Sequence, residues 1–377
     1  MKILLSGGGT AGHINPALAI ASYVKEQNPE AEILFVGSKG GMEERLVPQA
    51  GFDIQTVEVA GFQRKISLRN VGRNLRALYL VFAASAQAGK IIREFAPDVC
   101  VGTGGYVCGP VLRKAAQMGI PVLVHESNAF PGMTTKMLAK WAKAIMVSVS
   151  DAGKHLPDNC PIVVTGNPIR EEIVSYDPKK ARQELGLDER PVVLSFGGSL
   201  GAERVNRAIL ELIVHSTKTD KYQHIHAYGQ YGKWFPEELE ARGAAAAEHK
   251  NLDIREYIHD MPRCLAAADL VISRCGAMTL SEIQAKGKAS ILIPSPNVAE
   301  NHQYHNARAL VDRQAAELIE EKDLSGETLT AKATALLDRP ERLKTYSENA
   351  RKMAITNADE RIYHLITAQL PRESRTT

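Results

Sequence analysis

One pattern near the start of the chain restricts what it can fold into. An apolar run over Lys2–Leu5 leads into four glycines between positions 7 and 12, and a helical pattern follows over Pro16–Glu26. Glycines allow a tight turn and let a ligand approach the backbone without a Cβ in the way. The helix beyond them presents free N–H groups and a positive dipole end, which suit an anion. The glycine spacing fits neither the Walker pattern nor a dinucleotide fingerprint, so the bound group stays open at this point.

The second half of the chain repeats this plan. An apolar strand and a glycine loop recur over 192–202, and residues 98–105 resemble residues 269–276 in the same way. Apolar strand-like runs alternate with helical patterns throughout, which predicts parallel sheets with helices on both faces. A chain of 377 residues suffices for about two domains. We therefore predict an α/β protein with two tandem Rossmann-like, doubly wound domains whose glycine loops face a cleft.

The domain boundary is predicted at a turn-rich segment. Residues 165–170 follow a short apolar strand and contain Gly166 and Pro168. This choice gives an N-terminal domain over 1–165 and a C-terminal domain over 166–377. A helical run over about 341–370 is a candidate to pack back on the first domain.

Composition excludes several other classes of protein. The net charge of +3 is too small to indicate a nucleic-acid partner. The five cysteines are scattered without a C-x-x-C pair, which is typical of core packing in a reducing compartment. No apolar run approaches the length of a membrane span, so any contact with a membrane is expected at the surface.

The segment Ser273–Glu282 carries the most specific chemistry. A strand is predicted to end at Ser273, and a helix to begin near Thr279 after a glycine turn. The first N–H groups of that helix can hold a diphosphate without a metal ion. The Glu282 carboxylate can accept hydrogen bonds from ribose hydroxyls. Thr279 and Glu282 also fit a capping box, so an ordinary helix start is the alternative.

Further along, the amide of Gln303 suits sugar hydroxyls, although the same residue fits a solvated helix start. Together with this segment, six motifs occur in an order that resembles a known family, at 8–13, 102–106, 125–128, 166–170, 197–202 and 273–282. The chain resembles the bacterial glycosyltransferases that add N-acetylglucosamine to the lipid-linked peptidoglycan precursor, and the resemblance covers nearly all of it.

The resemblance implies the GT-B fold and an inverting transfer. N-acetylglucosamine would move from UDP-N-acetylglucosamine to the C4 hydroxyl of the undecaprenyl-diphosphate-linked N-acetylmuramyl-pentapeptide. Neither a metal ion nor an organic cofactor is expected. Three alternatives remain at this point: a diacylglycerol glycosyltransferase, a UDP-N-acetylglucosamine 2-epimerase, and a protein that binds a nucleotide sugar without catalysis.

The resemblance also implies the site residues. His13 and Glu126 are the two candidates for the general base, with a loop-ordering role as the alternative for His13. Ala11 stands where many members have glycine, which removes no functional group. The residues implied to bind the substrates are Thr10, Ala11, Gly12 and Asn128 in the first domain and Arg170, Ser199, Ile258, Ala277, Met278, Thr279, Leu280, Ser281, Glu282 and Gln303 in the second.

A lipid-linked acceptor implies a surface that faces the membrane. Apolar side chains at Leu75, Leu78, Tyr79 and Phe82 share one helical face. A basic cluster precedes or interleaves with them, at Arg64, Lys65, Arg69, Arg73 and Arg76. Basic charge beside exposed apolar side chains favours anionic lipid headgroups, so we predict peripheral binding at the cytoplasmic face of the membrane. The alternative is that the apolar face belongs to the core.

Overall fold

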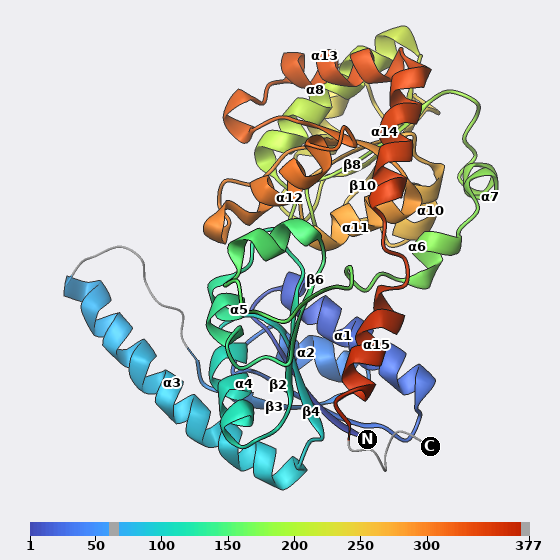
Figure 1. Cartoon of the computed structure of the whole chain (residues 1–377). Helices are drawn as coiled ribbons and strands as arrows, with labels where there is room; N and C mark the ends of the chain where they lie inside the picture. Colours follow the sequence, from blue (N-terminus) through green and yellow to red (C-terminus); the bar gives the residue numbers. More distant parts are fainter. Residues whose placement is uncertain (60–67, 371–377) are drawn as a thin grey trace. The chain divides into compact units, whose positions relative to one another are not determined.

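The computed structural model describes residues 1–59 and 68–370, with the side chains of 68–78 outside the description. The chain forms two compact units (Figure 1). Unit 1 comprises Met1–Pro168 together with Asn357–Thr377, and unit 2 comprises Ile169–Thr356. The chain therefore crosses between the units twice, near the boundary predicted at 165 and again before Asn357, within the run considered as a candidate to pack back on the first domain.

Unit 1 is built on a seven-stranded parallel sheet with the order β3-β2-β1-β4-β5-β6-β7. The strands are β1 (Lys2–Gly7), β2 (Glu32–Ser38), β3 (Asp53–Val57), β4 (Val99–Gly104), β5 (Val122–Glu126), β6 (Ala144–Val147) and β7 (Ile162–Val164). The helices between them are α1 (Ala11–Gln27), α2 (Glu43–Gln49), α3 (Leu68–Phe95), α4 (Cys108–Gln117) and α5 (Met133–Leu138).

The interior strand β1 shows why these strands are continuous apolar runs. Ile3, Leu4 and Leu5 are all fully buried. Leu4 packs in a cluster with residues of α3 and α4, whereas Ile3 and Leu5 pack in another cluster with residues of α1. Successive side chains on a strand point to opposite faces, so helices on both sides of the sheet require apolar residues at every position.

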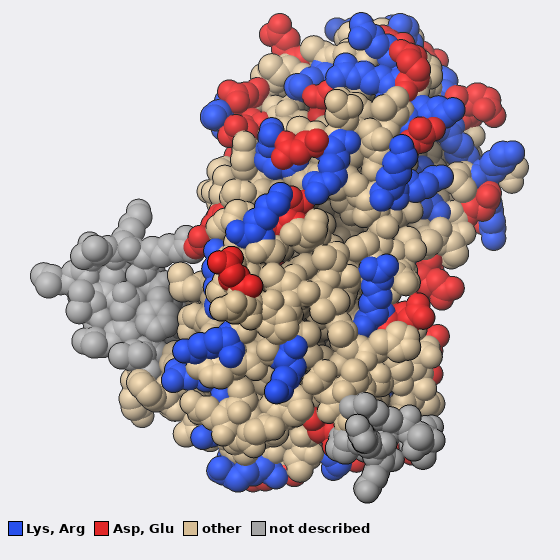
Figure 2. All heavy atoms as spheres, in the orientation of Figure 1, with Lys and Arg blue, Asp and Glu red and all other residues tan. Residues whose placement is uncertain are grey.

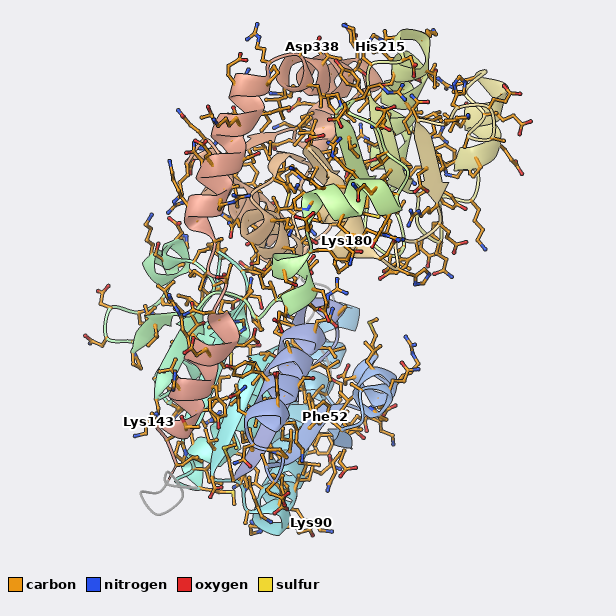
Figure 3. The ribbon with its side chains drawn as sticks, turned by 90° about the vertical axis from the view of Figure 1, so that its right-hand side faces the viewer. Phe52, Lys90, Lys143, Lys180, His215 and Asp338 are labelled. Atoms are coloured by element: carbon orange, nitrogen blue, oxygen red, sulfur yellow. The ribbon has the colours of Figure 1, made fainter. Side chains whose placement is uncertain are left out.

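The C-terminal segment departs from the single helical run expected over 341–370. It forms two helices, α14 (Pro340–Met353) and α15 (Ala358–Thr367). Helix α14 contacts α11 and α13 of unit 2, and α15 lies beside α1 in unit 1 (Figure 3). Ile362 and Ile366 of α15 are buried in the same cluster as Ile3 and Leu5. The last helix is therefore part of the core of unit 1.

Unit 2 repeats the architecture with a six-stranded parallel sheet in the order β10-β9-β8-β11-β12-β13. The strands are β8 (Val192–Phe196), β9 (Gln223–Ala227), β10 (Leu252–Arg255), β11 (Leu270–Ser273), β12 (Ala289–Leu292) and β13 (Ala316–Leu318). The helices are α6 (Glu171–Ser175), α7 (Pro178–Glu184), α8 (Glu203–Thr219), α9 (Phe235–Ala241), α10 (Met261–Ala267), α11 (Ala277–Lys286), α12 (His302–Val311) and α13 (Gly326–Leu337), followed by α14.

The two central strands of unit 2 bring its loops together. β8 and β11 are paired neighbours, with Leu270 opposite Val193 and Ser273 opposite Phe196. The loops that leave their carboxyl ends therefore start side by side at one edge of the sheet, where ligands bind in such folds. Within the described residues, no helix combines the length and the apolar character needed to cross a bilayer.

Candidate active site

The glycine loop of unit 2, residues 197–202, joins β8 to α8. Its carbonyl groups are held from one side, because the N–H of Gln230 donates to Ser199 (3.1 Å) and the N–H of Tyr231 donates to Leu200 (2.9 Å). Gly201 has φ +81°, and a Cβ there would lie 2.2 Å from the carbonyl oxygen of Tyr228. Only glycine fits this close approach, so the loop has one well-defined shape.

The start of α11 provides the second element of the site. Gly276 is its N-cap residue, and no side chain caps the helix. The N–H groups of Ala277, Met278 and Thr279 have no recorded acceptor within the described part of the chain, as expected of the first turn of a helix. The capping box expected from Thr279 and Glu282 is not formed, because the helix starts two residues earlier. These free donors and the helix dipole favour an anion.

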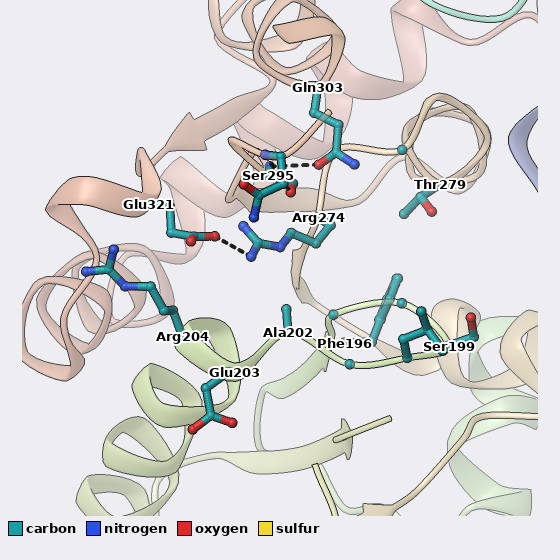
Figure 4. Close-up of a pocket in the computed structure, with 16 residues that line it drawn as sticks. Phe196, Ser199, Ala202, Glu203, Arg204, Arg274, Thr279, Ser295, Gln303 and Glu321 are labelled. Carbon is teal, nitrogen blue, oxygen red and sulfur yellow. Dashed lines mark hydrogen bonds and ion pairs between the residues drawn. The ribbon is translucent and has the colours of Figure 1, made fainter. Parts of the chain in front are cut away.

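A pocket of about 560 Å³ lies between the glycine loop and the start of α11 (Figure 4). Three residues predicted from the sequence line it, namely Ser199, Thr279 and Gln303. The lining also includes other residues of the predicted motifs at 197–202 and 273–282. The polar or charged side chains of the lining to which the sequence analysis assigned no role are Glu203, Arg204, Arg274, Ser295, Asn297 and Glu321.

The amide of Gln303 has a fixed orientation in this pocket. Its Oε1 accepts hydrogen bonds from the N–H of Cys275 (3.3 Å) and the N–H of Ser295 (2.9 Å). Because backbone N–H groups only donate, the oxygen must face them and the NH₂ group is left to donate elsewhere. A ligand that meets Gln303 must therefore offer it an acceptor oxygen.

A partly buried ion pair forms one wall of the pocket. The guanidinium of Arg274 pairs with the carboxylate of Glu321, and the two side chains are only 15% and 13% exposed. Arg274 also donates to the carbonyl groups of Ile293 (3.3 Å) and Pro294 (3.2 Å), which fixes its position. Forty-seven residues separate the partners, so no local sequence signal could have indicated the pair.

Glu282 and Arg170 lie together but do not line this pocket. The distance from Arg170 Nη2 to Glu282 Oε1 is 3.7 Å, and the Glu282 side chain is 19% exposed. Burial raises the pKa of the Glu282 carboxyl, and the positive charge of Arg170 opposes that rise. The charges of these two side chains therefore interact within unit 2.

The other predicted residues of unit 2 also lie outside the pocket lining. Ile258 is buried in the loop between β10 and α10, and Leu280 is buried on α11. Ser281 uses its hydroxyl to donate to the carbonyl of Ala277 (3.1 Å). Met278 contributes its backbone to the first turn of α11.

The glycine loop of unit 1, residues 7–12, leads directly to His13. Thr10 is the N-cap residue of α1, so the helix begins at Ala11 rather than at Pro16. His13 Nδ1 lies 3.1 Å from the carbonyl oxygen of Gly8 and 3.2 Å from Thr10 Oγ1. Because a carbonyl oxygen only accepts, Nδ1 of the neutral ring carries the proton and Nε2 keeps a free lone pair.

A neighbouring loop fits against this imidazole. Gly104, at the end of β4, has φ +111°, and a Cβ there would lie 2.6 Å from His13 Cδ2 and 2.9 Å from Nε2. The hydroxyl of Thr103 donates to the backbone carbonyl of His13 (2.7 Å). The end of β4 therefore holds both the ring and the backbone of this residue.

Glu126 is engaged in holding a loop. Its Oε1 accepts from the N–H and the side-chain amide of Asn128 (3.0 and 3.1 Å). Its Oε2 accepts from the N–H of Gly132 (2.9 Å) and the hydroxyl of Thr135 (2.6 Å). The side chain is buried, with 6% of the residue exposed. The carboxylate therefore orders residues 126–135 through four hydrogen bonds, and the loop side chain Asn128 is placed by it.

Comparison with known proteins also divides the chain into an N-terminal and a C-terminal domain. Residues 3–147 match the glycosyltransferase family 28 N-terminal domain, and residues 192–362 match the glycosyltransferase family 28 C-terminal domain. The crystal structure of Acinetobacter baumannii MurG is similar, with a TM-score of 0.78 and 28% identity over 97% of this chain and 99% of that one. A UDP-GlcNAc 2-epimerase from Neisseria meningitidis has a TM-score of 0.66 at 14% identity, which shows a shared fold alone.

These matches define a glycosyltransferase of GT-B architecture, with two Rossmann-like units, so the predicted fold class is confirmed. The family is more specific than that. The chain is 46% identical over 369 residues to the UDP-N-acetylglucosamine–N-acetylmuramyl-(pentapeptide) pyrophosphoryl-undecaprenol N-acetylglucosamine transferase of Acetivibrio thermocellus, and each chain is 97% covered. It is 45% identical to the protein of the same name from Thermoanaerobacter sp., over 97% of this chain and 99% of that one. The chain belongs to this family of peptidoglycan-precursor glycosyltransferases.

Proposed function

We propose that unit 2 binds UDP-N-acetylglucosamine and that unit 1 activates the acceptor hydroxyl. The acceptor is the C4 hydroxyl of undecaprenyl-diphosphate-linked N-acetylmuramyl-pentapeptide, and a single displacement inverts the anomeric carbon. The observation that carries the donor assignment is the pocket in which the glycine loop of 197–202 meets the uncapped start of α11.

The donor diphosphate is held by backbone groups in this proposal. The N–H groups of Ala277, Met278 and Thr279 donate to its oxygens, and the helix dipole adds positive potential. Arg274 lies on the pocket wall, with its charge partly balanced by Glu321. Fixed donors of this kind stabilise the negative charge that develops on the leaving UDP.

The donor sugar and ribose are assigned to neighbouring groups. The NH₂ group of Gln303 donates to a hydroxyl or carbonyl oxygen of the sugar, and the side chain of Ser199 lines the same pocket. Glu282 accepts from the ribose hydroxyls, and Ile258 contacts the uracil through its backbone. Arg170 stabilises the ionised form of Glu282 through their 3.7 Å contact.

The general base is assigned to His13 rather than to Glu126. The Nε2 lone pair of His13 takes the proton as the C4 oxygen attacks the anomeric carbon and the bond to UDP breaks. An imidazole suits this task at neutral pH. All four hydrogen bonds of Glu126 serve the loop around Asn128, so that carboxylate acts by shaping the site. The residues of unit 1 that are proposed to contact the donor sugar are Thr10, Ala11, Gly12 and Asn128.

We place the membrane-facing surface of unit 1 on α3 and α5. Tyr79 and Phe82 of α3 are 70% and 68% exposed, and Met133 and Met137 of α5 are 63% and 54% exposed. Both helices pack on α4. Large exposed apolar side chains of this kind suit the headgroup region of a bilayer.

Charge on α5 fits the same surface. Lys136 lies on that helix, and Lys140 follows two residues after its end at Leu138. On the face drawn in Figure 2, unit 1 has a large uncharged area with separate Lys and Arg side chains and some Asp and Glu, and unit 2 carries both signs interspersed. Of the basic cluster predicted from the sequence, Arg64 and Lys65 lie outside the described residues, as do the side chains of Arg69, Arg73, Leu75, Arg76 and Leu78.

The direct test is transfer of labelled N-acetylglucosamine from UDP to a short-chain analogue of the lipid-linked muramyl peptide. We expect acceptor-dependent transfer and release of UDP. Conversion of UDP-N-acetylglucosamine to its 2-epimer without acceptor would instead support an epimerase. Transfer to diacylglycerol in place of the muramyl peptide would move the chain to another class of glycosyltransferase.

A further inference from the structure

A buried carboxylate lies behind the glycine loop of unit 1. Glu43, the first residue of α2, is fully buried. Its Oε1 accepts from the N–H of Ser38 (2.7 Å), and its Oε2 accepts from the N–H of Gly9 (3.1 Å). Among the described residues, no Lys or Arg is recorded in an ion pair with it. A charge held in the interior by backbone groups alone needs an explanation.

The space around this carboxylate is made by three glycines. A Cβ on Gly8 would lie 2.0 Å from Glu43 Oε1, and one on Gly37 would lie 2.5 Å from its Cγ. A Cβ on Gly41 would lie 2.5 Å from its Cδ. Three chain segments therefore omit a side chain where the carboxylate sits, so the cavity fits this group and no larger one.

The Gly8–Gly9 peptide connects this carboxylate to the imidazole. The N–H of Gly9 donates to Glu43, and the C=O of the same peptide, from Gly8, accepts from His13 Nδ1 (3.1 Å). In a planar trans peptide the N–H and the C=O point in opposite directions. Fixing the N–H toward Glu43 therefore aims the carbonyl at His13. A charged acceptor also polarises the peptide, which strengthens the hydrogen bond made by its carbonyl.

The geometry points to Glu43 as a positioning residue that holds His13 in the Nδ1-protonated form through the Gly8–Gly9 peptide. This inference rests on the proposed function, in which Nε2 of His13 is the base. The carboxylate touches no substrate, and it acts by keeping the lone pair of the ring on Nε2. A carboxylate suits the position because its two oxygens accept and neither donates, and both neighbours are N–H groups.

The substitution Glu43→Gln tests the role with little change of shape. A glutamine can accept from only one of the two N–H groups, and its NH₂ then faces the other donor. The matched control is Glu44→Gln, which makes the same change at the next, exposed position of α2. Both are compared with the wild-type full chain after ¹⁵N labelling of histidine, with the His13 signals assigned from a His13→Gln spectrum.

In the wild type and in Glu44→Gln, we expect the neutral ring of His13 to show a protonated Nδ1 and an unprotonated Nε2. In Glu43→Gln, we expect a mixture of the two tautomers. The turnover number kcat should fall by about 10- to 100-fold, part of the contribution typical of a general base. The donor KM should change much less than kcat, because the pocket proposed for the nucleotide lies in unit 2. If Glu43→Gln does not fold, Glu43→Asp, which is one methylene shorter, takes its place with the same readouts.

The possible outcomes distinguish the positioning role of Glu43 from the role of His13 as the general base. An Nε2-protonated ring in the wild type would overturn the inference, and so would a fall in kcat with an unchanged tautomer. A shifted tautomer with wild-type kcat would support the positioning role of Glu43 but would refute His13 as the base. A loss of rate in His13→Gln with no tautomer change in Glu43→Gln would support His13 as the general base. It would refute the role of Glu43 in positioning it.

Discussion

The glycine loops of the two units share a plan and differ in what holds them. Each follows the first strand of its sheet and precedes a helix, β1 and α1 in unit 1 and β8 and α8 in unit 2. In unit 1 the loop rests on the buried carboxylate of Glu43 and ends in His13. In unit 2 it is held by backbone N–H groups of Gln230 and Tyr231.

This difference indicates a division of labour. A loop braced by a carboxylate is suited to orient an imidazole, and it would repel a phosphate placed close to that charge. A loop held by neutral backbone groups, beside the free N–H groups of α11, is suited to an anion. In the proposed mechanism, one supersecondary motif serves proton transfer in unit 1 and phosphate binding in unit 2.

The largest expected effect comes from removing the imidazole. His13→Ala should lower kcat by about 10²- to 10⁴-fold, the range typical of a general base, with donor affinity unchanged. The matched control is His215→Ala, which removes an exposed histidine on α8 of unit 2 (Figure 3). Steady-state transfer and UDP-N-acetylglucosamine titrations measure the two quantities. A variant without His13 that turns over at the wild-type rate would remove the proton-transfer role from unit 1.

A matched pair of glycine substitutions sharpens the comparison of the loops. Gly9 and Gly201 both have φ +81°, but a Cβ at Gly9 meets open space, whereas one at Gly201 meets the carbonyl of Tyr228 at 2.2 Å. Gly9→Ala should cost about 1–2 kcal/mol of backbone strain. Gly201→Ala adds roughly 1–3 kcal/mol of steric overlap and should weaken donor binding.

Denaturant unfolding and donor titration of both glycine variants provide the check. The account expects donor affinity to fall in Gly201→Ala alone. Equal losses of stability, or a loss of donor affinity in Gly9→Ala, would show that the two loops are not specialised in this way.

The next largest effect is expected from removing the proposed contact between Glu282 and the ribose. Glu282→Gln should weaken UDP-N-acetylglucosamine binding by roughly 1–3 kcal/mol, the usual worth of a hydrogen bond to a charged group. Burial raises the pKa of this carboxyl, so the ionised form is lost at a higher pH than for an exposed glutamate. Donor affinity should therefore decline as the pH falls toward that raised value, and Arg170→Ala should shift the decline to higher pH.

Calorimetric titrations from pH 7 to about 4.5 would follow this dependence. Because Glu282→Gln has no carboxyl to protonate, it serves as the control and should lose the pH dependence. If the variant kept both the affinity and the pH profile of the wild type, Glu282 would not bind the ribose.

The smallest effect is expected at the membrane surface of unit 1. Lys136→Ala and Lys140→Ala should each reduce binding to vesicles containing phosphatidylglycerol by about 1 kcal/mol. The control is the pair Lys179→Ala and Lys180→Ala, which removes two exposed lysines on α7 of unit 2. Vesicle co-sedimentation measures both. Equal losses in the two pairs would indicate general attraction by charge rather than a surface on α5.

Much of the fold could be predicted because its signals are local. An apolar run, a glycine cluster and a helical period in the sequence together predict each strand–glycine–helix unit. Helix starts were harder: α11 begins at Ala277 rather than near Thr279, because Gly276 caps it without a side chain. Helix α1 begins at Ala11, five residues before Pro16, because Thr10 takes the extended N-cap conformation.

The site residues that the sequence did not reveal depend on distant partners. Glu43 has the sequence signature of an ordinary acidic first-turn residue, and its role depends on glycines brought together by three segments. Arg274 and Glu321 meet across 47 residues. Motif matching identified Ser199, Thr279 and Gln303, but only the fold shows that Gln303 must donate and that Glu126 is engaged in four hydrogen bonds.

The most direct measurement of the proposed division of labour is a titration of the ¹⁵N-labelled full chain with UDP-N-acetylglucosamine. The account predicts saturable shifts of the backbone amides of Ala277, Met278 and Thr279, with the amides of Gly8 and Gly9 keeping their hydrogen-bonded positions. Saturable shifts at Gly8 and Gly9 with none at the start of α11 would contradict it, because the nucleotide sugar would then bind the loop assigned to proton transfer.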